Sequence, residues 1–131
     1  MKAKKNILII TDDAEATRKI ALAIAAVIKG SKVSVKTASD FKGNDILPAE
    51  AFFLGCEKPE PDSFSRLEDV LKHINLAGRP CGVFTPGAEK AAKYLAGLVK
   101  DSEAILYPEC LFAGSGTAIE TWTQNVLYNS F

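Results

Sequence analysis

The chain has 131 residues, which is the length of one ordinary globular domain. Apolar residues make up 47% of it and charged residues 24%, a balance that excludes wholesale disorder. Because 16 basic residues oppose 16 acidic ones, no bulk electrostatic field favours nucleic acid or an anionic membrane as a partner.

The sequence predicts neither a signal peptide nor a membrane span. The basic start of the chain is followed by a short apolar run at 7–10, which the Asp12–Asp13 pair ends. A membrane helix needs about 20 apolar residues. Cys56, Cys81 and Cys110 are widely spaced and form no C-x-x-C pair, so we expect reduced thiols and no structural zinc site. These observations predict a cytoplasmic protein.

Strands and helices alternate along the first third of the chain. Residues 6–11 (NILIIT) form a continuous apolar run, which is typical of a central strand buried on both faces. Helical spacing of apolar residues predicts a helix over 14–29, with Gly30 at the position of a C-cap. Residues 32–38 alternate between apolar and polar, which predicts a strand near the sheet edge. Residues 39–48 predict a loop with at most one helical turn.

The middle of the chain repeats this alternation. Residues 51–55 (AFFLG) predict a second buried strand. Residues 57–62 (EKPEPD) contain two prolines and predict a stiff loop outside any regular element. An apolar stripe predicts a helix over 63–75. Residues 81–85 (CGVFT) predict a third buried strand.

The last third continues the pattern. We predict a helix over 88–100, a fifth strand over 103–107 (EAILY), a loop over 108–116 and a final helix over 117–128. Strands that alternate with helices imply right-handed crossovers and a parallel sheet covered on both faces.

We therefore predict one domain over residues 1–131, of class α/β. The expected architecture is a three-layer α/β/α sandwich with a five-stranded parallel sheet of order 2-1-3-4-5. In such sheets ligands bind outside the carboxyl ends of the strands, at the switch point between strands 1 and 3. The candidate crevice comprises the residues that follow strands 1, 3 and 4, namely Thr11, Asp12, Asp13, Ala14, Glu15, Thr17, Gly55, Cys56, Glu57, Thr85, Pro86 and Gly87.

Several stretches of the sequence resemble the flavodoxins. They are NILIIT, AFFLGC with the loop that follows it, and LAGRPCGVFTPG, which leads into the fourth strand and its helix. In that family the third strand typically ends in a Gly-Ser/Thr-Pro-like loop, and a Gly-Lys/Arg pair precedes the fourth strand. Gly55–Cys56 and Gly78–Arg79 are similar to those features. The resemblance covers nearly the whole chain and implies a flavodoxin-like fold, with FMN as the cofactor if there is one.

The loop after the first strand departs from the flavodoxin pattern. Flavodoxins hold the FMN phosphate there with Ser/Thr-x-Thr-Gly-x-Thr, and this chain has TDDAEAT. Thr17 keeps the last hydroxyl, while Asp12, Ala14 and Glu15 replace the first Ser/Thr, the middle Thr and the Gly. A carboxylate about 5 Å from a phosphate charge costs on the order of 3 kcal/mol at an effective dielectric near 20. The helix dipole returns only about 1–2 kcal/mol. We therefore expect conventional FMN binding to be lost.

The same carboxylates have a structural interpretation. Asp12 and Glu15 fit a D-x-x-E capping box, which predicts that they cap the first helix. Receiver domains of response regulators share this topology, and the first forty or so residues are similar to one, with Asp12 and Asp13 apt for Mg²⁺ and Thr85 at the receiver's hydroxyl position. Strand 51–55, however, ends without the Asp that receivers phosphorylate, so we predict neither phosphotransfer nor a metal site.

Other conspicuous residues have ordinary interpretations. We expect His73 to be solvated, Trp122 to pack in the core, and Cys56 to be a buried, inert thiol although it lies near a helix N-terminus. The GSGT stretch at 114–117 predicts a turn, whose last residue forms a capping box with Glu120. We assign no catalytic residue, and the sequence leans against an enzyme.

Two classes of function follow. The favoured one is a flavodoxin-like domain without conventional FMN, which binds a small molecule or a protein partner and contacts neither nucleic acid nor membrane. The alternative is an FMN-binding flavodoxin-type electron carrier. The sequence makes no prediction of oligomeric state.

Overall fold

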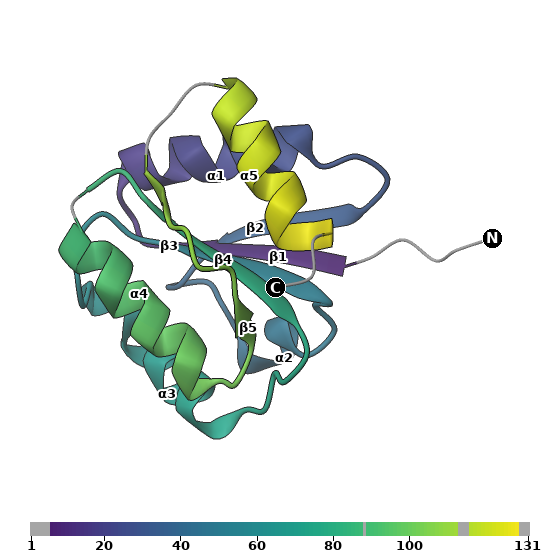
Figure 1. Ribbon diagram of the computed structural model, residues 1–131. Coiled ribbons are helices and arrows are strands. Elements are labelled where there is room, and N and C mark those ends of the chain that lie inside the picture. The colour runs from purple at the N-terminus through teal and green to yellow at the C-terminus, as the bar shows by residue number, and fades with distance from the viewer. Residues whose placement is uncertain (1–5, 88, 113–115, 129–131) are drawn as a thin grey trace.

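The computed structural model describes residues 6–87, 89–112 and 116–128. Its elements in chain order are β1 (Asn6–Thr11), α1 (Glu15–Val27), β2 (Lys32–Thr37), α2 (Gly43–Ile46), β3 (Ala51–Gly55), the short 3-10 helix η1 (Asp62–Phe64), α3 (Ser65–His73), β4 (Pro80–Thr85), α4 (Glu89–Asp101), β5 (Ile105–Leu106), β6 (Leu111–Phe112) and α5 (Gly116–Tyr128). Helices α1 and α5 cover one face of the sheet, and α3 and α4 cover the other (Figure 1). Within the described ranges, no helix is long and apolar enough to cross a membrane.

The sheet has the predicted topology. Its strand order is β2-β1-β3-β4-β5, and all pairs are parallel. In the central register Ile9 of β1 lies beside Val35 of β2 and Phe53 of β3. This arrangement confirms the α/β/α sandwich with order 2-1-3-4-5, and it brings the ends of β1 and β3 together at the switch point.

Side-chain alternation along β1 divides the core into two halves. Ile7 and Ile9 pack with residues of α1 and α5, whereas Leu8 and Ile10 pack with residues of α3 and α4. All of these isoleucine and leucine side chains are buried. A strand with apolar side chains on both faces must lie inside the sheet, which is why NILIIT occupies its centre.

Trp122 fills the α5 side of the core, as predicted. Its ring lies 5.5 Å from that of Phe53, and its Nε1–H donates a hydrogen bond to the Glu109 carbonyl at 2.8 Å. A Cβ on Gly82 would lie 2.8 Å from the Trp122 ring. The glycine in β4 therefore makes the room that the indole needs.

The start of α1 contradicts the predicted D-x-x-E capping box. The N-cap residue is Ala14 and not Asp12, and the described structure shows no side-chain hydrogen bond at that cap. Asp12 lies two residues before the N-cap, and its carboxylate accepts hydrogen bonds from the Ala14 and Glu57 N–H groups and not from the first turn of the helix. The helix ends at Val27, two residues early, and Gly30 follows with φ +74°, a left-handed conformation that suits glycine. The other predicted capping box rests on Thr117, whose side chain lies outside the described residues, as do 114 and 115 of the predicted turn.

The predicted fifth strand is shorter than expected and is broken. On the outer side of β4, strand β5 pairs with the first half of β4. Strand β6, which the sequence did not predict, pairs with the second half. Pro108 lies between the two short strands. It has no N–H to donate to a ladder, so the strand leaves the sheet there.

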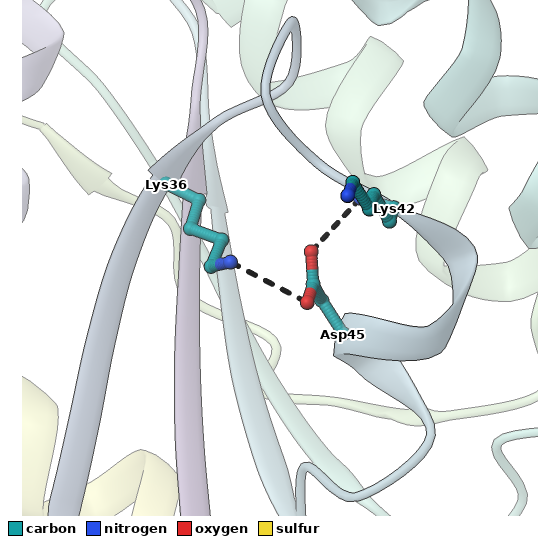
Figure 2. Close-up of polar contacts among 3 residues, drawn as sticks. All are labelled: Lys36, Lys42 and Asp45. Atoms are coloured by element: carbon teal, nitrogen blue, oxygen red, sulfur yellow. Dashed lines mark hydrogen bonds and ion pairs between the residues drawn. The ribbon is translucent and has the colours of Figure 1, made fainter.

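Helix α2 is the single turn that the sequence allowed, and an acidic side chain holds it against edge strand β2 (Figure 2). The Asp45 carboxylate accepts a hydrogen bond from the Lys42 backbone N–H at 2.9 Å. It also lies 3.4 Å from the Lys36 ammonium of β2. The Lys42 hydrogen bond lowers the pKa of Asp45 below its ordinary value of 3.8; partial burial opposes this, and Lys36 adds to it.

A lowered pKa means that Asp45 stabilises the fold when it is ionised. This contribution is complete above the ordinary pKa and disappears as the pH falls through the lowered pKa of the folded state. We expect Asp45→Asn to reduce the free energy of unfolding by about 0.5 kcal/mol at neutral pH, because the pair with Lys36 is partly exposed. Urea unfolding at neutral and acidic pH measures this. An Asp45→Asn variant that keeps the wild-type difference between neutral and acidic stability would contradict the assignment.

Candidate functional site

The ends of β1 and β3 are joined by one buried carboxylate. Asp12 is 6% exposed. Its Oδ2 accepts a hydrogen bond from the Glu57 N–H at 2.8 Å, and its Oδ1 accepts one from the Ala14 N–H at 3.2 Å. The Asp12 N–H donates to the Gly55 carbonyl at 3.2 Å. The switch point therefore holds a negative charge that belongs to the protein and is bound by backbone donors of both loops.

The loop after β4 packs against the loop after β3. A Cβ on Gly87 would lie 2.1 Å from the Glu57 carbonyl oxygen, so only glycine permits this approach. The buried Thr85 hydroxyl accepts a hydrogen bond from the Gly87 N–H at 2.9 Å and fixes the turn. One turn of backbone thus brings the Pro86–Gly87 segment into contact with Glu57.

Gly55 has a separate packing role at the end of β3. A Cβ there would lie 2.2 Å from the ring of Phe84, which crosses over it from β4. The pattern of the sequence placed Gly55 in the crevice, and the structure shows that its hydrogen atom faces an aromatic ring of the core.

The acidic residues of the first loop have different environments. Asp13 is exposed, and its carboxylate oxygens lie 3.4 and 3.5 Å from the Ser39 hydroxyl, which follows β2. Glu15 is exposed in the first turn of α1. Only Asp12 turns inward, so the predicted cluster consists of one buried charge and two surface charges.

Thr17 is the third residue of α1, and its side chain is fully buried. Its hydroxyl has no hydrogen-bond partner among the residues that the structure describes. A buried hydroxyl without a partner is uncommon and calls for an explanation. Its position one turn inside the start of a helix is where an anion would be bound by neighbouring N–H groups.

Cys56 is not a reactive thiol. It is completely buried, and burial, together with the nearby Asp12 and Cys110, raises its pKa to about 12. Burial also raises the pKa of Cys81, and raises that of Cys110 to about 11. A thiol with such a pKa is protonated at neutral pH and is a poor nucleophile. All three cysteines are free.

The histidine of the chain, His73, lies at the exposed end of α3. The His73 side chain is 74% exposed, as predicted, and faces Asp69 on its own helix. In the described part of the chain, no group of His, Cys, Asp and Glu residues is arranged to hold a metal ion.

Two contributors to this edge of the sheet were missed from the sequence. Ser39 follows β2 at the same carboxyl edge, and its position after a predicted strand was a signal that it would face Asp13. The Glu57 backbone N–H is the principal partner of Asp12, and nothing in the sequence distinguishes one backbone N–H from another.

No family model matches the chain, and no curated protein matches it in sequence. Solved structures do match it. The flavodoxin of Streptococcus pneumoniae TIGR4 is 19% identical with a TM-score of 0.79, over 92% of this chain and 96% of that one. Oxidised flavodoxin 2 from Bacillus cereus is 20% identical with a TM-score of 0.78, over 92% and 95%. The Fusobacterium nucleatum flavodoxin bound to flavin mononucleotide is 14% identical with a TM-score of 0.73, over 93% and 96%. The chain therefore has the flavodoxin-like fold.

The geometry predicts which acidic residue matters for stability. We expect Asp12→Ala to lower the free energy of unfolding by about 1–3 kcal/mol, because it leaves partly buried N–H groups of Ala14 and Glu57 without an acceptor. Chemical denaturation measures this.

Two matched variants separate this role from helix capping. Glu15→Ala and Asp13→Ala remove exposed carboxylates and should each change stability by less than about 0.5 kcal/mol. If Glu15→Ala were as costly as Asp12→Ala, capping would be the main role of the acidic loop.

Proposed function

We propose that this protein is a flavin-free binding module of the flavodoxin-like fold. The observation that carries the proposal is the Asp12 carboxylate, which accepts hydrogen bonds from the Ala14 and Glu57 N–H groups. Those groups are the backbone donors that an anionic ligand would use at a switch point. Asp12 therefore takes the place of a ligand anion with a charge that is part of the chain.

Electrostatics oppose a phosphate beside this carboxylate. At about 5 Å and an effective dielectric near 20, the repulsion of each pair of unit charges is on the order of 3 kcal/mol. Moving Asp12 aside would leave its donors unpaired or exchange one anion for another, so little is gained in return. Asp13 and Glu15 add negative charge at the rim of the same loop.

The region where a flavin ring would enter also supports the proposal. The loops after β3 and β4 have no aromatic side chain before Phe64, and Phe64 is itself buried in the core. The Glu57 carbonyl meets Gly87 directly, so these loops touch at this point. A planar cofactor gains much of its affinity from aromatic contact, and this crevice offers none from those loops.

One observation favours the alternative, an FMN-binding electron carrier. The Thr17 hydroxyl is buried and has no partner in the described structure, which is what an anion site at the start of α1 would leave in the absence of its ligand. Among the structural neighbours, the Fusobacterium nucleatum flavodoxin is bound to flavin mononucleotide. We rank this alternative second, because Thr17 is the only hydroxyl that remains in the loop from Asp12 to Thr17.

Titration with FMN tests the proposal directly. We expect the purified chain to be colourless and to leave the fluorescence of added FMN unquenched at micromolar protein. Saturable quenching at micromolar concentration would show that the electron-carrier alternative is right.

A gain-of-function variant tests the cause. The triple substitution Asp12→Thr, Ala14→Thr and Glu15→Gly restores the hydroxyls and the glycine of the flavodoxin pattern. Removing a repulsion of about 3 kcal/mol should tighten FMN binding by roughly a hundredfold or more. The matched control Asp13→Asn removes an exposed charge from the same loop and should tighten binding far less than the triple variant does, because solvent and salt screen that charge. If the triple variant folds, as judged by its circular dichroism, and binds FMN no better than wild type, the acidic loop is not what prevents binding.

A further inference from the structure

The broken edge of the sheet leaves a cavity that none of the crevice residues lines. The cavity has a volume of about 260 Å³ and lies between α4 and the chain segment from β5 to β6. It is a consequence of the break. The chain leaves the sheet over residues 108–110, between the part of β4 that pairs with β5 and the part that pairs with β6. Val83 of β4 lines the cavity at this interruption.

Small side chains on α4 keep the cavity open. Ala92 and Ala96 are four residues apart, so they lie on the same side of the helix, and both line the cavity. A larger residue at either position would fill the space. The opposite wall comes from the β5–β6 segment and includes Leu106, Tyr107 and Pro108.

The lining is largely apolar and is open to solvent. Phe112, which lines the cavity, is 41% exposed. A large apolar side chain left exposed at an open cavity is surface that gains free energy when a ligand covers it. A concave apolar site with few polar groups is the usual form of a small-molecule pocket.

The charged groups that line the cavity are a lysine and a glutamate of α4. Lys93 is exposed and forms no ion pair within the part of the chain that the structure describes, and Glu89 lies one helical turn before it. Lys93 offers an ammonium to an anionic group of a ligand. Glu89 balances that charge, so the site favours a single negative charge over a phosphate dianion.

We propose that this cavity binds a small ring-containing monoanion, with the ring between α4 and the β5–β6 segment and the anionic group at Lys93. The volume of about 260 Å³ lies just below the usual range of small-molecule pockets, so the ligand must be small. The site shares no residue with the candidate crevice, so the inference holds whether or not the protein binds FMN.

A pair of fluorescent probes tests both features of the ligand. Anilinonaphthalene sulfonate carries a ring system and one negative charge, and phenyl-naphthylamine is its neutral counterpart. We expect both to bind wild type with enhanced fluorescence and Ala96→Phe, which fills the cavity, to weaken both at least tenfold. Lys93→Ala should weaken only the sulfonate, by about threefold to fivefold, as expected for an exposed charge contact.

The controls use the same helix. Lys90→Ala removes an exposed lysine of α4 that does not line the cavity, and it should leave both affinities unchanged. Circular dichroism and the melting temperature establish that Ala96→Phe is folded. Binding that is insensitive to Ala96→Phe in a folded variant would overturn the proposal.

Cys110 supplies an independent readout of position. It lines the cavity and is partly exposed, whereas Cys56 and Cys81 are fully buried. Because its pKa is raised to about 11, alkylation by N-ethylmaleimide is best followed at alkaline pH by mass spectrometry. We expect saturating anilinonaphthalene sulfonate to slow the alkylation of Cys110 at least threefold in wild type and not in Ala96→Phe. If saturating probe left the alkylation of Cys110 unchanged, the probe would bind elsewhere. If sedimentation showed that the chain self-associates and that this protects Cys110 without any probe, the cavity would belong to an interface with a second copy of the chain. Either result would overturn the proposal.

Discussion

The hydrogen bond between the Asp12 carboxylate and the Glu57 N–H links the loop after β1 to the loop after β3, at the switch point where related sheets bind ligands. A carboxylate as buried as this one is tolerated only if its oxygens accept hydrogen bonds, because an unpaired buried charge is strongly unfavourable. The Ala14 and Glu57 N–H groups meet that requirement, and in doing so they fix the loops after β1 and β3 relative to each other. The position of the loop after β4 follows, since Gly87 packs directly on Glu57.

The central strands of this fold could be predicted because each is a short apolar run in the sequence. NILIIT, AFFLG and CGVFT are short, largely apolar runs bounded by polar or turn residues, which is typical of strands covered on both faces. The role of Asp12 could not be predicted in the same way. Its local pattern fits a helix cap, yet its partner Glu57 is 45 residues away, and a local pattern cannot show which of two donors a carboxylate will meet. The sequence therefore indicated which residues follow β1, β3 and β4, while the hydrogen bond that links the first two of these loops was missed.

The edge of the sheet formed by β5 and β6 shows the same limit of prediction from local sequence. Pro108 was a clear signal that the fifth strand ends, because proline cannot donate to a ladder. The chain returns at Leu111 and Phe112 to pair with β4. This pairing depends on where β4 lies in space, and a pattern of two residues does not encode that position. The cavity beside Ala92 and Ala96 is the space between α4 and the segment that leaves the sheet, so the periodicity of apolar residues could not predict it either.

Under the proposed function, Asp12 explains how a flavodoxin-like fold can persist without an anion bound at the switch point. The carboxylate acts as a tethered competitor, and a tethered group competes at an effective concentration of at least about millimolar. A free anion of the same intrinsic affinity must exceed that concentration, and it must also overcome the repulsion of Asp13 and Glu15 and compensate for the loop contacts that Asp12 now makes. The apolar cavity at β5–β6 has no such internal occupant among the described residues, and its Lys93 ammonium is unpaired there. If both proposals hold, a ligand binds at the broken edge of the sheet and not at the switch point.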